Sequence, residues 1–515
     1  MMKIVKYDEV YLKVECDMDV AYELQEYFTF FVPGYKFMPL YKNKVWDGKI
    51  RLFNPVTKLV YAGVIKHIES FCKEREYDLE IDDEYSAKEF SLFEAKEFIK
   101  TLNLPSHLET RDYQIDAFVY SVRNNRSLLV SPTASGKSFI IYLLTRYFNV
   151  KTLIVVPTTT LVHQMASDFK SYGYRHPNDS IVYSEQSDHG RSDSTTPSSA
   201  NVKRASARSS DYDGIHKVFS GQEKDDPEAQ ITVTTWQSIY KLPKKWFDKY
   251  DLVIGDEAHL FKAKSLGTIM GNLTQCKHRF GFTGTLDGTE THKLVLEGLF
   301  GPVRNVITTS ELMEQKHVSE LKIKAIVLKH REEIRKLMTG KTYQEEMDYL
   351  VSSEARNRFI KNLTLSLNGH TLVLYQYVDK HGKPLYNMLK DAPIPVFFVH
   401  GGVEGEERDK IRHIVMGEKA SIILASYGTF STGINIPNIE NVIFASPSKS
   451  RIRNLQSIGR GLRKSDGKTT ATLYDIADDL TWKSSKNHTI NHFVERIKIY
   501  NEEKFDYKIY NVELK

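Results

Sequence analysis

The sequence has few cysteines and no long apolar segment. Only three cysteines occur in 515 residues, at Cys16, Cys72 and Cys276. Their odd number and wide spacing exclude a disulfide framework and a zinc cluster. No apolar run approaches the length of a membrane span, and residues 1–11 are charged and mixed, without the apolar core of a signal peptide. We therefore expect a protein of the reducing cytoplasm with no membrane partner.

The net charge is small as well. A formal charge of +5 decides nothing about partners, so the placement of basic residues has to carry any argument for nucleic-acid binding. The length predicts about three domains, and a hydrophobic fraction of 41% is typical of a globular protein.

Aliphatic residues are almost absent between about residues 185 and 226. Residues 187–211 hold eight serines and one aliphatic residue larger than alanine, Val202. Because such a segment cannot form a core, we expect a disordered, solvated insertion; an arm that touches DNA is the alternative.

The most informative stretch follows the apolar run 128–130. Residues 131–138 read SPTASGKS and lead directly into a second apolar segment. A buried strand, a loop of small residues and a helix start present N–H groups and a positive dipole end to an anion. Ser131 replaces the first glycine of G-x-x-x-x-G-K-[ST], and Ala134 stands where many such loops have another, so a plain strand-to-helix turn is the alternative.

We interpret this stretch as a phosphate-binding loop for a nucleoside triphosphate. Lys137 would contact phosphate, and the hydroxyl of Ser138 would bind Mg²⁺. The predicted loop residues are Ser131, Pro132, Thr133, Ala134, Ser135, Gly136, Lys137 and Ser138.

A second stretch, DLVIGDEAH at 251–259, ends an apolar strand with two adjacent carboxylates. Open α/β sheets bind ligands at the C-terminal ends of their strands. Asp256 is predicted to hold Mg²⁺, and Glu257 to polarise the attacking water as a general base. A chance DEAH on a surface helix is the alternative. Because a phosphate loop precedes this stretch, we interpret the two together as an ATPase site.

Residues 111–114 and 157–164 are weaker signals. The side chain of Gln114 carries the donor and acceptor that pairing with adenine requires. The hydroxyl-rich segment PTTTLVHQ would bind backbone phosphates without a charge, or it is an ordinary helix cap.

A second α/β series begins beyond about residue 309. Strands are expected at 321–328, 371–375, 396–399, 421–425 and 441–444. In QSIGRGLR, Arg460 and Arg463 are three residues apart and so would share a helix face. We predict that they act as arginine fingers on the γ-phosphate of ATP held by the first domain. Two surface arginines are the alternative.

Aromatic and basic residues interleave in residues 27–53. Such a surface would combine phosphate contacts with base stacking. A hairpin around Asp47-Gly48, with aromatic side chains inward and lysines outward, explains the pattern equally well. The residues proposed for DNA binding are Lys42, Lys44, Trp46, Lys49 and Arg51.

Together the motifs resemble those of the superfamily 2 helicases of the DEAH type. They are RDYQ, SPTASGKS, PTTTLVHQ, TTWQS, DEAH, TGT, HGG, STGINIP and QSIGRGLR, in that order. The resemblance implies two RecA-like domains with ATP in the cleft between them and nucleic acid across their tops.

The resemblance also implies roles for single residues. Gln114 would read adenine, Thr283 and Thr285 would couple the site to DNA, and Gly433 and Gln456 would complete the nucleotide site. Asn435 replaces the aspartate that many relatives have near this glycine. The implied nucleic-acid contacts are Thr158, Thr159, Thr160, Thr234, Thr235, Trp236, Gly401, Gly402, Thr429 and Ser431.

Outside the motor motifs, GYKFMP, VWDGKIRL, GKTYQEE and EKFDY resemble the UvsW helicases, which are recombination and fork-remodelling enzymes of tailed bacteriophages. We therefore expect an α/β protein with two RecA-like parallel-sheet domains, 106–308 and 309–515, preceded by a small α+β DNA-binding domain, 1–105.

The expected activity is that of an ATP- and Mg²⁺-dependent DNA helicase acting on branched DNA. It would drive branch migration, fork regression and the unwinding of D-loops, R-loops or Holliday junctions in phage recombination, replication and repair. Expected partners are single-stranded and branched duplex DNA, RNA in R-loops, and single-strand-binding or recombination proteins, with the chain itself monomeric in the host cytoplasm. A DEAH-type RNA helicase and a restriction-type duplex DNA translocase are the alternatives.

Overall fold

The computed structural model describes residues 1–81, 89–106, 108–174, 214–403, 405–433, 438–446, 448, 450–462 and 468–514. The chain divides into two compact units. One comprises Met1–Leu129, Gly136–Phe282 and Thr289–Val306, and the other comprises Val130–Ser135, Thr283–Gly288 and Ile307–Lys515. No helix in the described part of the chain is long and apolar enough to cross a bilayer.

The chain begins with a small mixed α+β domain whose five strands lie in the order β5-β6-β2-β1-β7. β1 pairs antiparallel with β2 and parallel with β7. Alternation along β2 buries Leu12 and Val14, and residues of α1 and α3 pack into the same core. The elements are β1 (Met2–Lys6), β2 (Tyr11–Glu15), α1 (Met18–Tyr27), β5 (Phe53–Asn54), β6 (Leu59–Tyr61), η2 (Ala62–Val64), α3 (Ile65–Glu74) and β7 (Leu79–Ile81).

A separate antiparallel pair, β3 (Thr29–Phe31) and β4 (Lys49–Arg51), extends from this domain. Its connection holds η1 (Tyr35–Phe37) and α2 (Pro39–Lys42), so the predicted tight turn at Asp47-Gly48 is wrong. Gly48, at a φ of +80°, instead lies against the ring of Tyr35, where a Cβ would be 2.3 Å from a ring carbon. We call residues 29–51 the β3–β4 segment.

The first motor domain is built on a sheet whose seven described strands lie in the order β10-β11-β9-β12-β13-β8-β14. The pairings from β10 through β13 are parallel, and the strands are almost continuously apolar, as expected for a sheet covered on both faces. The strands are β8 (Arg126–Val130), β9 (Thr152–Val156), β10 (Ile215–Val218), β11 (Ile231–Thr235), β12 (Leu252–Asp256), β13 (His278–Thr283) and β14 (Val303–Asn305).

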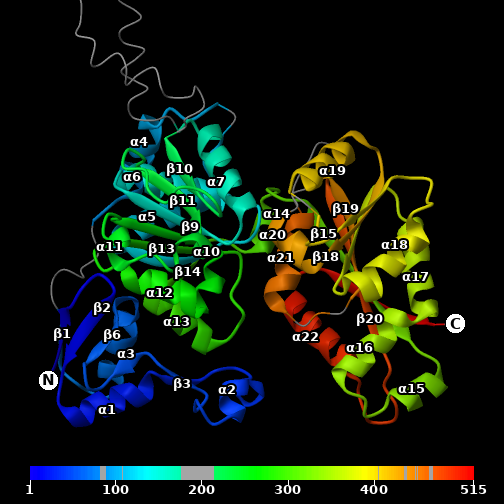
Figure 1. The fold of residues 1–515 in the computed structure, drawn as a ribbon, viewed down its shortest axis with the longest axis horizontal. Helices are drawn as coiled ribbons and strands as arrows, with labels where there is room; N and C mark the ends of the chain where they lie inside the picture. The colour runs from blue at the N-terminus through cyan, green and yellow to red at the C-terminus, as the bar shows by residue number, and fades with distance from the viewer. Residues whose placement is uncertain are drawn as a thin grey trace, which may run out of the picture. The chain divides into compact units, whose positions relative to one another are not determined.

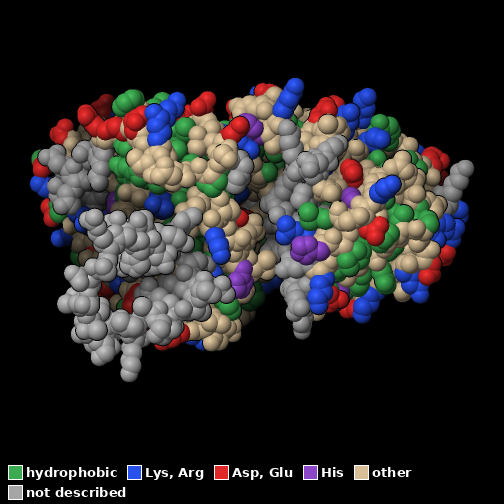
Figure 2. Space-filling model, turned by 90° about the horizontal axis from the view of Figure 1, so that it is seen from above, with side chains coloured by type: hydrophobic (Ala, Val, Ile, Leu, Met, Phe, Trp, Pro, Cys, Tyr) green, Lys and Arg blue, Asp and Glu red, His purple; other side chains and the backbone are tan. Residues whose placement is uncertain are grey.

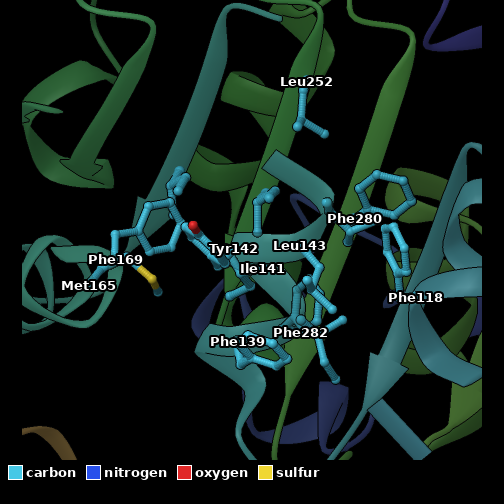
Figure 3. Packing of buried hydrophobic residues seen from close by; sticks show 14 of the residues in the cluster. Phe118, Phe139, Ile141, Tyr142, Leu143, Met165, Phe169, Leu252, Phe280 and Phe282 are labelled. Atoms are coloured by element: carbon cyan, nitrogen blue, oxygen red, sulfur yellow. The ribbon is translucent and has the colours of Figure 1, made fainter. Parts of the chain in front are cut away.

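Helix α6 (Lys137–Phe148) lies at the centre of this domain, and its residues 139–145 are all buried. Side chains of α6, α7 and β13 converge in one apolar cluster, in which Phe139, Tyr142 and Phe169 lie close together (Figure 3). The other helices are α4 (Leu92–Thr101), α5 (Asp112–Asn124), α7 (Thr159–Ser171), α10 (Trp236–Ile239), α11 (Lys244–Phe247), η4 (Ala258–Lys262), α12 (Lys264–Asn272) and α13 (Glu290–Phe300).

Residues 175–213, which include most of the insertion predicted at about 185–226, lie outside the described residues. The predicted end of the insertion, at about residue 226, lies too far along the chain, because residues 214–226 contain β10. This strand pairs parallel with β11 and buries Ile215 and Val218. Two apolar residues in the segment IHKV are enough to add an edge strand to a sheet that is already formed.

The second motor domain has a sheet whose seven described strands run β17-β18-β16-β19-β20-β15-β21, and its pairings are parallel. The predicted α/β class, with two parallel-sheet domains behind an α+β domain, is confirmed. Its strands are β15 (Glu320–Lys329), β16 (His370–Tyr375), β17 (Val396–Val399), β18 (Ser421–Ser426), β19 (Ile439–Phe444), β20 (Thr470–Asp479) and β21 (Tyr507–Glu513).

All five strands predicted here are confirmed, whereas β20 and β21 were not foreseen. The helices are α14 (Thr309–Glu314), α15 (Glu332–Met338), α16 (Tyr343–Ser352), α17 (Glu354–Leu365), η5 (Val378–Gly382), α18 (Lys383–Leu389), α19 (Gly405–Gly417), α20 (Tyr427–Gly433), α21 (Arg451–Gly461) and α22 (His488–Glu502) (Figure 1).

A fully buried ion pair joins α17 to β20 in this domain. Nε of Arg356 donates to the carboxylate of Asp478 at 2.9 Å, and His330 lies 3.0 Å from the same carboxylate. Burial opposes the charge of Asp478, but Arg356 and His330 outweigh it and lower the pKa of Asp478 to about 2. The pair therefore stays charged at neutral pH.

The N-terminal domain is fixed to the first motor domain through α13, within one compact unit. Gly63, in η2, lies so close to α13 that a Cβ would be 1.9 Å from the carbonyl oxygen of Glu297. Nε2 of His67 lies 2.8 Å from the carboxylate of Glu297, and Leu294 joins the core of the N-terminal domain. The N-terminal domain, which bears the β3–β4 segment, is therefore packed against the first motor domain.

Replacing Gly63 with alanine should break this contact, because the new methyl group has no space beside the backbone of α13. We expect a loss of about 1–3 kcal/mol in the free energy of unfolding, and earlier proteolytic release of the N-terminal domain. Gly267→Ala is the matched control, since Gly267 lies in α12 and a Cβ there would have nothing within 4 Å, so alanine should be neutral or slightly stabilising. Urea unfolding and timed proteolysis measure both effects. Wild-type behaviour of Gly63→Ala would show that this contact does not hold the domain.

Candidate nucleotide-binding site

The predicted phosphate loop lies between β8 and α6. The N–H of Ser131 donates to the carbonyl of Thr283 at 2.8 Å. The hydroxyls of Ser131 and Ser135 are 2.6 Å apart, and Ser135 donates to the carbonyl of Pro132 at 2.7 Å. Ser131, which replaces the first glycine of the pattern, therefore stabilises the loop through these hydrogen bonds.

Two residues of the loop have left-handed backbone conformations. Ala134 has a φ of +70° and Gly136 a φ of +81°. Many such loops carry glycine at position 134. The structure shows why, because the left-handed conformation strains an alanine. No side chain caps α6 at Gly136, so the start of this helix keeps the character of an anion-binding terminus.

Gln114, near the start of α5, contacts this loop. Its side chain is buried, and Oε1 accepts a hydrogen bond from the N–H of Arg111 at 3.1 Å. Nε2 lies beside Gly136, where a Cβ would approach it to 2.3 Å. The side chain predicted to read adenine is thus packed against the turn that precedes Lys137, and only glycine fits there.

The two predicted catalytic carboxylates follow β12. Glu257 has a φ of +51°, a strained conformation for this residue, and its N–H donates to Oδ1 of Asp256 at 2.9 Å. Burial and the negative charge of Glu257 raise the pKa of Asp256 to about 6, and the positive charge of Lys137 acts in the opposite direction. Nδ1 of His259 lies 3.5 Å from the carboxylate of Glu257. Lys137 and both carboxylates therefore share one electrostatic environment.

The TGT segment follows β13. Thr283 and Thr285 are buried, and the hydroxyl of Thr283 donates to the carbonyl of Thr285 at 2.9 Å. Because the carbonyl of Thr283 also accepts from Ser131, the end of β13 and the phosphate loop are hydrogen-bonded to each other.

The threonines predicted to contact nucleic acid divide into two groups. Thr159 and Thr160 are exposed at the start of α7. Thr158 caps that helix by accepting from the N–H of Leu161, and Thr234 and Thr235 are buried with their hydroxyls bonded inside the domain. Trp236 is half-buried beside Tyr240. Of the residues predicted to contact DNA at the end of β11, Trp236 is therefore the one whose side chain is partly exposed.

In the second motor domain, Gln456 and Arg460 belong to α21. Arg463 and Asn435 lie outside the described residues, as do the side chains of Arg460 and Ser431. The prediction that the two arginines share a helix face therefore lies outside the described residues.

The other predicted contacts of this domain follow strands β17 and β18. Gly401 and Gly402 come directly after β17. Thr429 is buried in α20, with its hydroxyl 2.8 Å from that of Ser426, and Gly433 ends the same helix.

Three family models match the chain. The N-terminal model of the DNA helicase UvsW matches residues 2–82, the res subunit of type III restriction enzymes matches residues 107–288, and the helicase conserved C-terminal domain matches residues 354–465. The ATP-dependent DNA helicase uvsW of Enterobacteria phage T4 is 33% identical over 537 residues, which cover 100% of both chains.

The chain belongs to the UvsW family of superfamily 2 helicases. It is therefore an ATP-dependent DNA helicase, and the family predicted from the motifs is confirmed. The crystal structure of T4 UvsW matches 100% of both chains at 32% identity, with a TM-score of 0.48. The DNA 3'-5' translocase XPB2 of Sulfurisphaera tokodaii is 24% identical over 70% of this chain and 80% of its own length.

One residue beside the predicted phosphate loop carries no signal in the sequence. Tyr172 follows the last residue of α7, and its hydroxyl lies 2.8 Å from Oγ of Ser138. It stands in the plain segment KSYGY, which matches no motif. Only the packing of α7 against α6 brings it to the phosphate loop.

Gly136→Ala should weaken nucleotide binding about tenfold or more, because alanine is strained at this φ and its methyl group would displace Gln114. Fluorescent-ADP titration measures the affinity, and circular dichroism checks the fold. Gly221→Ala is the control for backbone strain, since Gly221 has a φ of +81° but nothing within 4 Å. Gly136→Ala with Gln114→Ala should recover part of the affinity. Unchanged affinity in the single variant would contradict the assignment of this loop.

Proposed function

We propose that this helicase remodels branched DNA, by branch migration, fork regression and the unwinding of D-loops, R-loops or Holliday junctions in recombination, replication and repair. The observation that carries the proposal is the β3–β4 segment, which presents basic and apolar side chains to solvent. A motor that grips one strand tracks along it, whereas branch remodelling also needs a hold on a duplex arm. The N-terminal domain would supply that second hold.

The exposed side chains of the β3–β4 segment suit this role. Lys42 and Lys44 are exposed, and Phe37 is 81% and Val45 73% exposed. Exposed apolar side chains beside lysines are characteristic of surfaces that combine phosphate contacts with base stacking. Phe37 is better placed for stacking than Trp46, because the Trp46 indole is half-buried and donates to the carbonyl of Lys49.

Lys49 and Arg51, the other two basic residues predicted to bind DNA, already make contacts within the segment. The side chain of Lys49 lies over the ring of Phe31 at 5.0 Å, and Arg51 forms an ion pair with Asp47 at 2.5 Å. Lys42 and Lys44 should therefore contribute most of the phosphate contacts. Basic and acidic side chains are mixed over the described part of the face in Figure 2, so charge marks no single basic patch there.

The family models also support the proposed domain boundaries at about residues 105 and 308. Each of the three models lies inside one proposed domain. A DEAH-type RNA helicase and a duplex translocase are not proposed further, because the N-terminal model is that of a DNA helicase.

For ATP turnover we propose that Lys137 holds phosphate and that Glu257 orients and deprotonates the attacking water. Ser138 and Asp256 would hold Mg²⁺, and their hydroxyl and carboxylate oxygens are the donors this cation prefers. Burial and the neighbouring carboxylate of Glu257 raise the pKa of Asp256, so a cation fits the charge of the site. When bound, Mg²⁺ neutralises charge on the β- and γ-phosphate oxygens.

Arg460→Ala and Arg463→Ala should each lower ATP turnover by about 10³-fold or more, because an arginine that stabilises the transferring phosphate acts mainly in the transition state. Nucleotide affinity should change little in both variants, whereas Lys137→Ala should lose affinity and turnover together. Arg358→Ala is the control, since Arg358 is an exposed arginine of α17 paired with Glu354. Single-turnover hydrolysis and nucleotide titration measure the two quantities. Near-normal turnover in both finger variants would contradict the assignment.

Lys42→Ala with Lys44→Ala should weaken binding to forks and four-way junctions more than to single strands. Each lost phosphate contact should also reduce the slope of log affinity against log salt by about 0.7–0.9. Lys66→Ala with Lys73→Ala, two exposed lysines of α3, removes the same charge from another face of the domain. Affinity for fork, single-stranded and four-way DNA across a salt series, with ATPase stimulation by the same DNAs and by RNA, measures the effects. If the Lys42/Lys44 variant keeps its fork preference, branch recognition resides elsewhere.

A further inference from the structure

The hydroxyl of Ser138 is held by a tyrosine from the neighbouring helix. Oγ of Ser138 lies 2.8 Å from the hydroxyl of Tyr172, the residue that follows α7. The Tyr172 ring meets the rings of Phe139 and Tyr142 edge-on, at 5.4 and 5.5 Å between centroids. The tyrosine is therefore fixed by packing, and its hydroxyl is aimed at the serine by a rigid cluster, part of which is visible in Figure 3.

Either hydroxyl can donate in this hydrogen bond, so Tyr172 can accept the proton of Ser138. A serine hydroxyl has one proton and two lone pairs, and a hydroxyl that binds a cation must direct its proton away from it. The phenol oxygen of Tyr172, 2.8 Å away, is a neutral acceptor that can take this hydrogen bond without adding charge. Oδ1 of Asp256, the other predicted cation ligand, already accepts from the N–H of Glu257.

We propose that Tyr172 is a positioning residue for the Mg²⁺ site. By accepting the proton of Ser138, it leaves the serine lone pairs for the cation and fixes the rotamer in which they are presented. The inference rests on the proposed role of Ser138 as a ligand of Mg²⁺. It assigns a function to a residue that belongs to none of the helicase motifs.

A purely structural role makes a different prediction. If the bond only ties α7 to α6, its loss should lower stability and leave the cation requirement unchanged. Tyr172→Phe separates the two, because it removes the hydroxyl and keeps the ring in the cluster. Tyr142→Phe is the matched control, since Tyr142 belongs to the same cluster but its hydroxyl is bonded to Arg146 at 3.3 Å.

The test is ADP binding by the full chain, titrated in EDTA and across a Mg²⁺ series, with thermal melting in parallel. Tyr172→Phe should raise the Mg²⁺ concentration for half-maximal enhancement of ADP binding by about two- to tenfold, as expected for one hydrogen bond. ADP affinity in EDTA and the melting temperature should match those of the wild type, and Tyr142→Phe should match it throughout.

Ser138→Ala distinguishes failure of this inference from failure of the site. If Ser138→Ala retains the wild-type Mg²⁺ dependence, Ser138 is not a ligand and the proposed site itself is wrong. If Ser138→Ala loses that dependence while Tyr172→Phe retains it, only the role of Tyr172 is overturned. A lower melting temperature of Tyr172→Phe with unchanged Mg²⁺ dependence would overturn it in favour of the structural role.

Discussion

The hydrogen bond from the N–H of Ser131 to the carbonyl of Thr283 ties the phosphate loop to the end of β13. This bond joins backbone groups, so it forms equally well with a serine where the usual pattern has glycine. The hydroxyl of Ser131 forms a second hydrogen bond, with the hydroxyl of Ser135 in the same loop. The N-cap residue of α6 is Gly136, so the start of the helix has no side-chain cap of its own, as suits an anion-binding terminus.

Several residues in and near this loop have strained backbone conformations. Ala134 and Glu257 both have a positive φ, and Gly136 has no room for a side chain beside Gln114. Such conformations persist only where the surrounding structure enforces them. The loop leads directly into α6, whose residues 139–145 are all buried in the apolar core of the first motor domain.

The N-terminal domain is tied to the same framework. α13 begins shortly after the TGT segment, and near its other end it carries the backbone contact with Gly63 and the His67–Glu297 pair. The domain that bears the β3–β4 segment is therefore packed against the helix that follows the TGT segment in the chain.

Local patterns determined much of this protein. Apolar runs located five strands of the second sheet and the strands that precede the phosphate loop and the carboxylates, because a parallel strand covered on both faces is largely apolar. The spacing of glycine, lysine and serine located the phosphate loop, and the residues after β12 located the carboxylates. The family followed from those motifs, and the identity of 33% to the T4 helicase confirms it.

Only the tertiary structure decided the rest, since these features depend on contacts between residues far apart in the chain. β10 forms at the end of a serine-rich segment because β11 offers it an edge. Gly48 packs against Tyr35 where the sequence suggested a turn, and Thr234 and Thr235 are buried although their motif suggested DNA contacts. Tyr172 carries no signal of its own, and it reaches Ser138 because an aromatic cluster between α6 and α7 sets where its hydroxyl points.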